Sequence, residues 1–254
     1  MPGSFDLQSI ALHMVALLLS LSLHEAARAG TALALGDDTP ARSGRLTLNP
    51  LPHLSAFGTL IFPMLVLLLT GGHVRGIYGW AKAIPVSPAR FTRKLRFRTS
   101  VALVSASGLL ACFLLSLLFL VLGCLAVRSL APSPAERWPL LEMMMAGPSA
   151  LADRGIPLGR LVLLGLSGTL IWTNILLMGF NLIPIAPLDG AAILRGILPS
   201  KALPDYDRIQ TNPYTWLVLF LFIWLGPFER FVMLPFQNAI LTVLSPFARL
   251  LLGA

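Results

Sequence analysis

The residues best suited to chemistry in this 254-residue chain are His24 and Glu25, which lie inside an apolar run that begins near Leu7. Ionisable side chains at membrane depth are costly to bury and mark functional sites. The pair forms the first half of the H-E-x-x-H signature, in which two histidines one helical turn apart bind zinc. The second histidine position holds Arg28. The stretch therefore predicts a metal-type site in which one ligand position is changed.

Composition places these residues in a membrane protein. Hydrophobic residues make up 56% of the chain and charged residues 12%, which is about half the charged share of a soluble domain. Several uncharged runs reach or approach the roughly 20 residues that span a bilayer core. The sequence predicts an all-α polytopic protein of the lipid bilayer, whose net charge of +8 reflects juxtamembrane basic residues and requires no nucleic acid. The uncharged runs are 99–127, 161–188, 209–228 and 231–248.

We expect about five transmembrane helices, one re-entrant segment and a short strand region within a single domain of residues 1–254. Residues 55–70 are apolar but short, and a re-entrant path keeps the basic regions 28–45 and 75–98 on one side of the membrane. The alternation of Arg45-Leu46-Thr47-Leu48 predicts the strand. The expected core helices are 7–35, 99–127 and 161–188, followed by a C-terminal helical hairpin over 209–252.

The distribution of basic residues orients the site. Residues 28–98 carry ten Lys and Arg, whereas the loop 128–160 carries four, offset by three acids. Cytoplasmic loops carry the excess of Lys and Arg. We therefore expect the first helix and the 161–188 helix to run in the same direction, with the site facing the cytoplasm of a bacterial-type inner membrane.

A second acidic residue closes the 161–188 run. Asp189 could simply mark the exit of this helix into water, because polar residues at helix ends are ordinary. Its place at the end of a helix parallel to that of His24 favours a shared site. The residues that form a motif around it are Asn181, Pro184, Pro187 and Gly190.

Five motifs follow one another in the chain: His24-Glu25, Gly36 to Pro50, His53 to Gly58, Trp80-Ala81-Lys82 with Pro85-Val86, and Asn181 to Gly190. Their order and spacing resemble the site-2 protease (M50-type) family of intramembrane zinc metalloproteases, from about Ser22 to Pro199. The resemblance implies that His24 and Asp189 bind zinc and that Glu25 is the general base. Zinc-bound hydroxide would then attack a peptide bond within the membrane.

Three departures from the family pattern bear on this chemistry. Arg28 stands at the second histidine position, and a guanidinium has no lone pair to offer a metal. The segment Ser107 to Cys112 lacks the proline and the asparagine of the family's Ala-Gly-Pro-x-x-Asn motif, and Ala83 stands where a proline is usual. The chain thus resembles a divergent member of this family, with a broken H-E-x-x-H motif.

Two residues bear on what replaces the missing ligand. His53 lies within reach by loop position, although active members of the family carry a histidine there as well. We expect instead that Arg28 pairs with Asp189, with Glu25 as a second candidate partner, and replaces the metal electrostatically.

Three functions remain open. The first, which the loss of a ligand favours, is a non-catalytic pseudoprotease that binds or regulates a transmembrane protein partner and holds no cofactor. The second is an active intramembrane zinc metalloendopeptidase that cleaves transmembrane substrates, with Glu25 as general base and with His24, Asp189 and either His53 or water around the metal. The third is a transporter whose intramembrane charges line a pathway, which the ordered motifs do not support.

Overall fold

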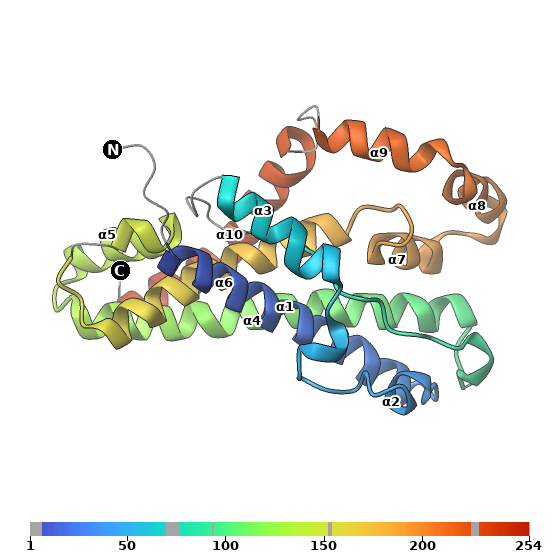
Figure 1. Ribbon diagram of the computed structural model, residues 1–254, viewed down its shortest axis with the longest axis horizontal. Helices are drawn as coiled ribbons and strands as arrows, with labels where there is room; N and C mark the ends of the chain where they lie inside the picture. The colour runs from blue at the N-terminus through green and yellow to red at the C-terminus, as the bar shows by residue number, and fades with distance from the viewer. Residues whose placement is uncertain (1–6, 70–76, 93, 152–153, 225–228, 254) are drawn as a thin grey trace.

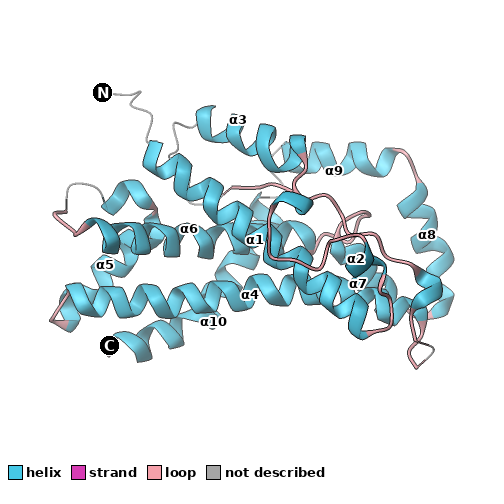
Figure 2. Cartoon of the chain, turned by 60° about the horizontal axis from the view of Figure 1, so that its bottom comes forward, coloured by secondary structure: helices cyan, strands magenta, loops and turns pink. Residues whose placement is uncertain are grey.

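The computed structural model describes residues 7–69, 77–92, 94–151, 154–224 and 229–253. Within these ranges the chain consists of helices and connecting loops, without a strand (Figures 1 and 2). Four of the described helices are long and apolar enough to cross a bilayer, which confirms the predicted all-α polytopic membrane fold. They are α1 (Leu7–Ala34), α4 (Phe97–Leu130), α6 (Leu158–Asn181) and the C-terminal helix made of η6 (Glu229–Met233) and α10 (Leu234–Leu252).

Shorter helices connect and cover these spans. Figure 1 places α7, α8 and α9 at one end of the bundle and α5 at the opposite end. They are α2 (Thr39–Arg42), η1 (Leu51–His53), η2 (Ala56–Ile61), α3 (Phe62–Leu69), η3 (Pro88–Arg90), α5 (Pro134–Ala146), η4 (Pro148–Leu151), α7 (Asp189–Ile197), η5 (Ser200–Ala202), α8 (Leu203–Thr211) and α9 (Tyr214–Trp224).

The helix α4 packs against both α1 and α6 and forms the centre of the bundle. As predicted, α1 and α6 run in the same direction, and α4 runs in the opposite one (Figure 1). Glycines allow the close approach that membrane helices need. A Cβ atom at Gly123 would lie 2.6 Å from the sulfur of Met144, and one at Gly168 would overlap the carbonyl oxygen of the same residue. The short helix α5 therefore packs closely against both α4 and α6.

The largest buried cluster lies where α4, α5, α6 and α10 meet. Cys112, Met144 and Ile171 are fully buried there, and Leu244 is nearly so. Dispersion and close packing hold this end of the bundle together. The ionisable residues of α1 lie outside this cluster and are positioned by other contacts.

An extended segment, residues 77–87, passes beside η2. The N–H of Trp80 donates to the carbonyl of Gly58 at 3.1 Å, and the N–H of Lys82 donates to the carbonyl of His53 at 2.8 Å. Gly58 leaves room for the indole ring of Trp80, which would overlap a Cβ atom at that position. The segment is therefore held in place along η1 and η2.

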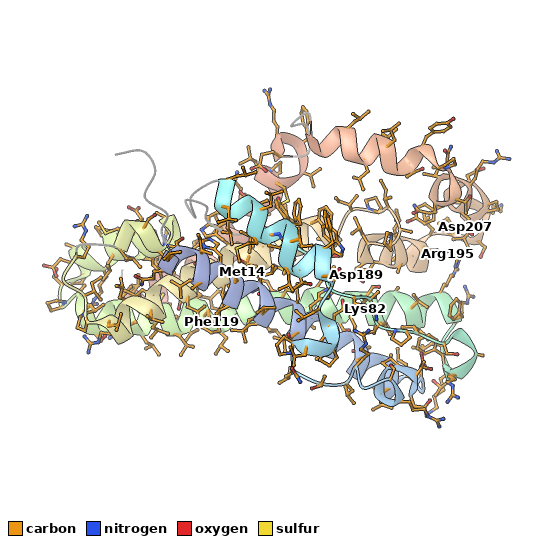
Figure 3. All side chains as sticks on the ribbon, in the orientation of Figure 1. Met14, Lys82, Phe119, Asp189, Arg195 and Asp207 are labelled. Carbon is orange, nitrogen blue, oxygen red and sulfur yellow. The ribbon has the colours of Figure 1, made fainter. Side chains whose placement is uncertain are left out.

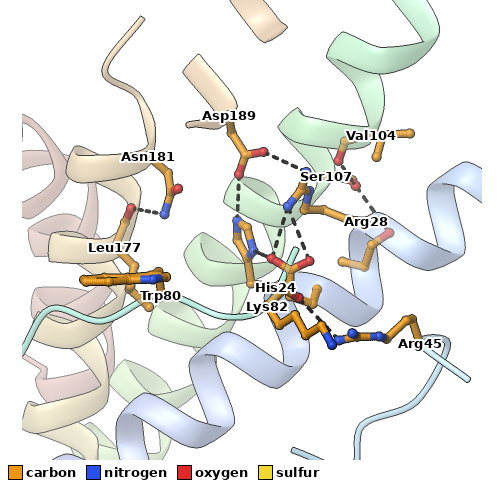
Figure 4. A network of polar contacts seen from close by, with 12 residues as sticks. His24, Arg28, Arg45, Trp80, Lys82, Val104, Ser107, Leu177, Asn181 and Asp189 are labelled. Atoms are coloured by element: carbon orange, nitrogen blue, oxygen red, sulfur yellow. Dashed lines mark hydrogen bonds and ion pairs between the residues drawn. The ribbon is translucent and has the colours of Figure 1, made fainter. Parts of the chain in front are cut away.

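The predicted strand at residues 45–48 does not form. The guanidinium of Arg45 donates to the carbonyl of Lys82 (Figure 4) and to that of Pro52, which anchors the segment as an irregular loop. The strand prediction was wrong because alternation assigns side chains to two faces but supplies no neighbouring strand, and a strand needs a ladder partner.

The helix predicted over 161–188 ends earlier, at Asn181. Turns follow, and α7 begins at Asp189. The prediction was wrong at this boundary because Pro184 and Pro187 have no N–H to donate to a helical carbonyl. Asp189 therefore lies at the start of a new helix instead of at the end of the long one.

Two further segments that the sequence predicts to lie in the membrane are only partly described. Helix α9 has 11 residues, and the part of the predicted C-terminal hairpin at 225–228 lies outside the described residues. The predicted re-entrant segment 55–70 corresponds to one apolar helix, Ala56–Leu69, which is shorter than the four spans; residue 70 is not described. The fifth span, the re-entrant path and the single-domain boundary remain predictions.

The substitution Gly168→Ala should destabilise the protein by about 1–3 kcal/mol, because its new Cβ atom would press on the backbone of α5. The matched control is Gly159→Ala on the same helix, where a Cβ atom would meet nothing within 4 Å. Thermal unfolding in detergent measures both. Equal stability of the two variants would contradict the close packing of α5 on α6.

Candidate functional site

The site lies where the second half of α1 faces the first residue of α7 (Figures 3 and 4). His24, Glu25 and Arg28 come from α1, and Asp189 begins α7. His24 and Glu25 are each 4% exposed, and Asp189 is 3% exposed. Helical spacing places His24 and Arg28 one turn apart on one face of α1, so both side chains reach the same carboxylate.

The guanidinium of Arg28 forks between two carboxylates (Figure 4). Its Nη1 donates to Glu25 Oε1 at 3.1 Å and to Oε2 at 3.3 Å. Its Nη2 lies 3.4 Å from Asp189 Oδ1. The expected pair of Arg28 with Asp189 is present, and Glu25 is the second partner.

The imidazole of His24 completes a ring of four side chains. Its Nδ1 lies 3.3 Å from Glu25 Oε1, and its Nε2 lies 3.0 Å from Asp189 Oδ2. Each carboxylate thus contacts both a histidine and the guanidinium of Arg28. Because the ring is buried, removal of one member would leave another charge without its partner, which is costly inside a protein.

A cavity of about 480 Å³ lies against this ring. The ring and the side chain of Asn181 form its polar wall. The rest of the lining is mainly apolar, so the cavity suits a hydrophobic side chain or segment. Its apolar lining includes Leu21, Trp80, Phe180, Leu188 and Leu219.

A curated relative from Bacillus subtilis (strain 168), named "Putative zinc metalloprotease YwhC", is 30% identical to the chain over 226 residues. The match covers 89% of this chain and 85% of the relative. The chain belongs to a zinc metalloprotease family. No family model and no solved structure matches the chain.

Membership of this family implies zinc, but the donors at the site do not fit a zinc ion. His24 Nε2 and Asp189 Oδ2 are buried and are the two atoms that could face one ion, but they lie 3.0 Å apart and contact each other directly. Protein zinc sites use three or four ligands, and the next position on α1 holds Arg28, which has no lone pair. Across the described ranges, no group of three or more His, Cys, Asp or Glu residues could hold a metal.

The structure does not bring His53 into this group. Its ring is 2% exposed, and its Nε2 lies 3.0 Å from the carbonyl oxygen of Thr47. It does not line the cavity beside the ring. The side chains that the fold does bring together are those of His24, Glu25, Arg28 and Asp189.

The loop that presents Asp189 is held by α8. Gln210 Oε1 accepts from the N–H of Ala186 at 2.6 Å, and its Nε2 donates to the carbonyl of Pro184 at 2.9 Å. The hydroxyl of Tyr206 lies 3.1 Å from the same carbonyl of Pro184. These bonds satisfy backbone groups that the break in the helix leaves unpaired.

The other residues of the motif shape the same turn. Asn181 Nδ2 donates to the carbonyl of Leu177 at 2.9 Å, within the last turn of α6. A Cβ atom at Gly190 would overlap the carbonyl of Leu182, so the turn needs glycine there. The motif thus serves to fold the chain back toward α1.

An exposed ion pair joins α7 to α8 outside the membrane spans. Arg195 Nε and Nη2 donate to the two carboxylate oxygens of Asp207, each at 2.9 Å (labelled in Figure 3). Hydrogen bonds from Arg195 hold the pKa of Asp207 below its ordinary value. The pair therefore stays charged at neutral pH and orients α8 over the loop.

Gly108 of α4 is a site residue that the sequence indicated only as part of a divergent motif. A Cβ atom there would lie 2.5 Å from His24 Nε2, so the backbone of α4 packs directly on the imidazole. The hydroxyl of Ser107 lies 3.3 Å from the carbonyl of Ala27 on α1. The available signal was the run of small residues at 105–108 in an otherwise bulky apolar helix.

Replacement of Arg28 by glutamine should lower the free energy of unfolding by about 3–5 kcal/mol, because Glu25 and Asp189 would stay buried without a cation. Thermal unfolding in detergent measures the loss. Arg42→Gln is the matched control, since Arg42 pairs with Asp38 at the surface and such pairs contribute little. Similar losses in the two variants would show that the buried fork is not a stabilising contact.

Proposed function

We propose that this chain is a site-2-protease-type member of its family that does not cleave peptide bonds. In this proposal it binds a transmembrane segment of a protein partner and holds or regulates it. The observation that carries the proposal is the Arg28 fork, which pairs with both Glu25 and Asp189 where a zinc enzyme needs a metal.

The first argument concerns the metal. Hydrolysis by a zinc enzyme requires a bound water whose pKa the metal lowers to about 7. With His24 and Asp189 as donors the chain supplies two ligands, and metal affinity falls steeply when ligands are lost. The positive charge of Arg28 balances the two carboxylates in its place.

The second argument concerns the general base. A general base must be free to take a proton from water. Both carboxylate oxygens of Glu25 accept hydrogen bonds from Arg28, and Oε1 also lies 3.3 Å from His24. A carboxylate held in this way already accepts hydrogen bonds from protein side chains and is not free to take a proton from water.

The partner is inferred from the cavity beside the ring. Its largely apolar lining suits a segment that arrives from the lipid phase, and its volume of about 480 Å³ admits part of such a segment. The excess of Lys and Arg in residues 28–98 supports a site on the cytoplasmic side of a bacterial-type inner membrane.

The second candidate function is an active intramembrane zinc metalloendopeptidase. The printed name of the relative favours it, as does the separation of 3.0 Å between His24 Nε2 and Asp189 Oδ2. An enzyme of this kind would need water or another group to complete the coordination of the metal.

Zinc content per mole of purified protein distinguishes the two functions. We expect wild type to hold almost no zinc and Arg28→His to gain about one ion, because histidine restores a third protein ligand. Arg28→Gln is the matched control, since it removes the charge without adding a strong ligand. Stoichiometric zinc in wild type, together with cleavage of a transmembrane test substrate, would overturn the proposal.

A further inference from the structure

A second cavity also reaches Arg28 and Asp189. Unlike the first cavity, it is not lined by Trp80 or Phe180. It measures about 440 Å³ and lies among α4, α7 and α8. Its walls are mainly apolar and form a slot that no step of the proposed function uses. The apolar lining includes Ile84, Val86, Phe97, Val101, Leu188 and Ala192.

A shallower hollow of about 480 Å³ adjoins this slot and forms its mouth. The two hollows share Phe97, Arg98 and Arg195, which makes them continuous. The mouth adds Arg96 and Ser200. Three guanidinium groups, from the start of α4 and the last turn of α7, therefore surround one opening.

The mouth carries an excess of positive charge. Among the ion pairs of the described residues, none joins a carboxylate to Arg96 or Arg98. Arg98 Nη1 donates to the carbonyl of Leu198 at 3.1 Å, and Arg195 uses Nε and Nη2 to bind Asp207. Of the carboxylates that line the slot, Asp189 pairs with Arg28 and Asp207 offsets the charge of Arg195, so the excess positive charge at the mouth comes from Arg96 and Arg98.

The mouth also lies at a membrane surface. Arg96 is the N-cap residue of α4, one of the spans, and it closes a basic stretch that directly precedes the uncharged run 99–127, as is typical of residues at the membrane surface. Arg96, Arg98 and Arg195 all line the opening, so a headgroup phosphate seated there would lie beside three guanidinium groups.

We propose that the two hollows bind one anionic phospholipid. Its phosphate lies at Arg96, Arg98 and Arg195, because guanidinium groups bind phosphate through paired, charge-assisted hydrogen bonds. Part of its hydrocarbon fills the slot toward Arg28, where burial of apolar surface is favourable. A free phosphate would meet the same arginines but would leave the apolar slot unfilled.

The bound lipid would connect the membrane surface to the charge ring. The slot is walled by Tyr206 and Gln210 of α8 and ends at Arg28 and Asp189. An occupant would therefore support the packing of α8 on the loop that presents Asp189. This inference does not depend on whether the site binds zinc.

Native mass spectrometry of the full chain in detergent, with added phosphatidic acid or phosphatidylcholine of equal chain length, tests the proposal. Wild type should retain phosphatidic acid in preference to phosphatidylcholine. The double variant Arg96→Gln/Arg98→Gln should bind phosphatidic acid on the order of tenfold or more weakly. Lys94→Gln is the matched control, because it removes a charge from the same basic stretch but lines neither hollow.

Equal binding of the two lipids by wild type would overturn the proposal, as would an equal loss in Lys94→Gln. A further variant, Ala192→Phe, narrows the slot without changing charge and should weaken binding of phosphatidic acid but not of inorganic phosphate. If Ala192→Phe binds the lipid like wild type, the arginines hold phosphate alone and the lipid assignment fails. If Ala192→Phe does not fold, the contrast between the arginine variants and Lys94→Gln decides.

Discussion

The ion pairs of Arg28 with Glu25 and Asp189 are the interaction on which this end of the molecule depends. They join α1 to α7 through carboxylates that are almost fully buried, and an unpaired buried charge is costly. The chain must therefore return after α6 so that Asp189 meets α1. The prolines of the loop, the glycine that follows Asp189 and the hydrogen bonds from α8 all serve this return.

The opposite end of the bundle is held by different forces. There α4, α5, α6 and α10 enclose an apolar cluster, and glycines on α4 and α6 admit the side chain and backbone of Met144. Such packing tolerates little change in volume but needs no charge. At the site end, Gly108 likewise allows close packing, here of the α4 backbone against the imidazole of His24. One helix, α4, thus joins an apolar scaffold to a polar site.

The membrane fold and the central residues of the site were predictable because both follow from free-energy costs: that of exposing long apolar runs to water and that of burying ionisable side chains. Long uncharged runs have few stable environments except lipid, and ionisable residues inside them need partners, which led to His24, Glu25 and Asp189. The local sequence pattern did not predict the structure correctly where contacts between distant segments determine it. The alternation at 45–48 could not reveal the absence of a partner strand, and hydropathy could not locate the break at Asn181. The support from α8 and the contact at Gly108 depend on neighbours distant in the chain.

A guanidinium and a zinc ion meet the same electrostatic need in different ways. Zinc would join α1 to α7 through His24 and Asp189, whereas Arg28 joins them through Glu25 and Asp189, so either could hold the two helices together. Zinc, however, leaves an open position for water and lowers its pKa, whereas a guanidinium offers only N–H donors, and those of Arg28 are directed at Glu25 and Asp189. In the proposed function, the buried pair therefore joins α1 to α7 but supplies no means of activating water. The proposal thus accounts for a cavity and helix contacts beside a site that lacks a third protein ligand for zinc.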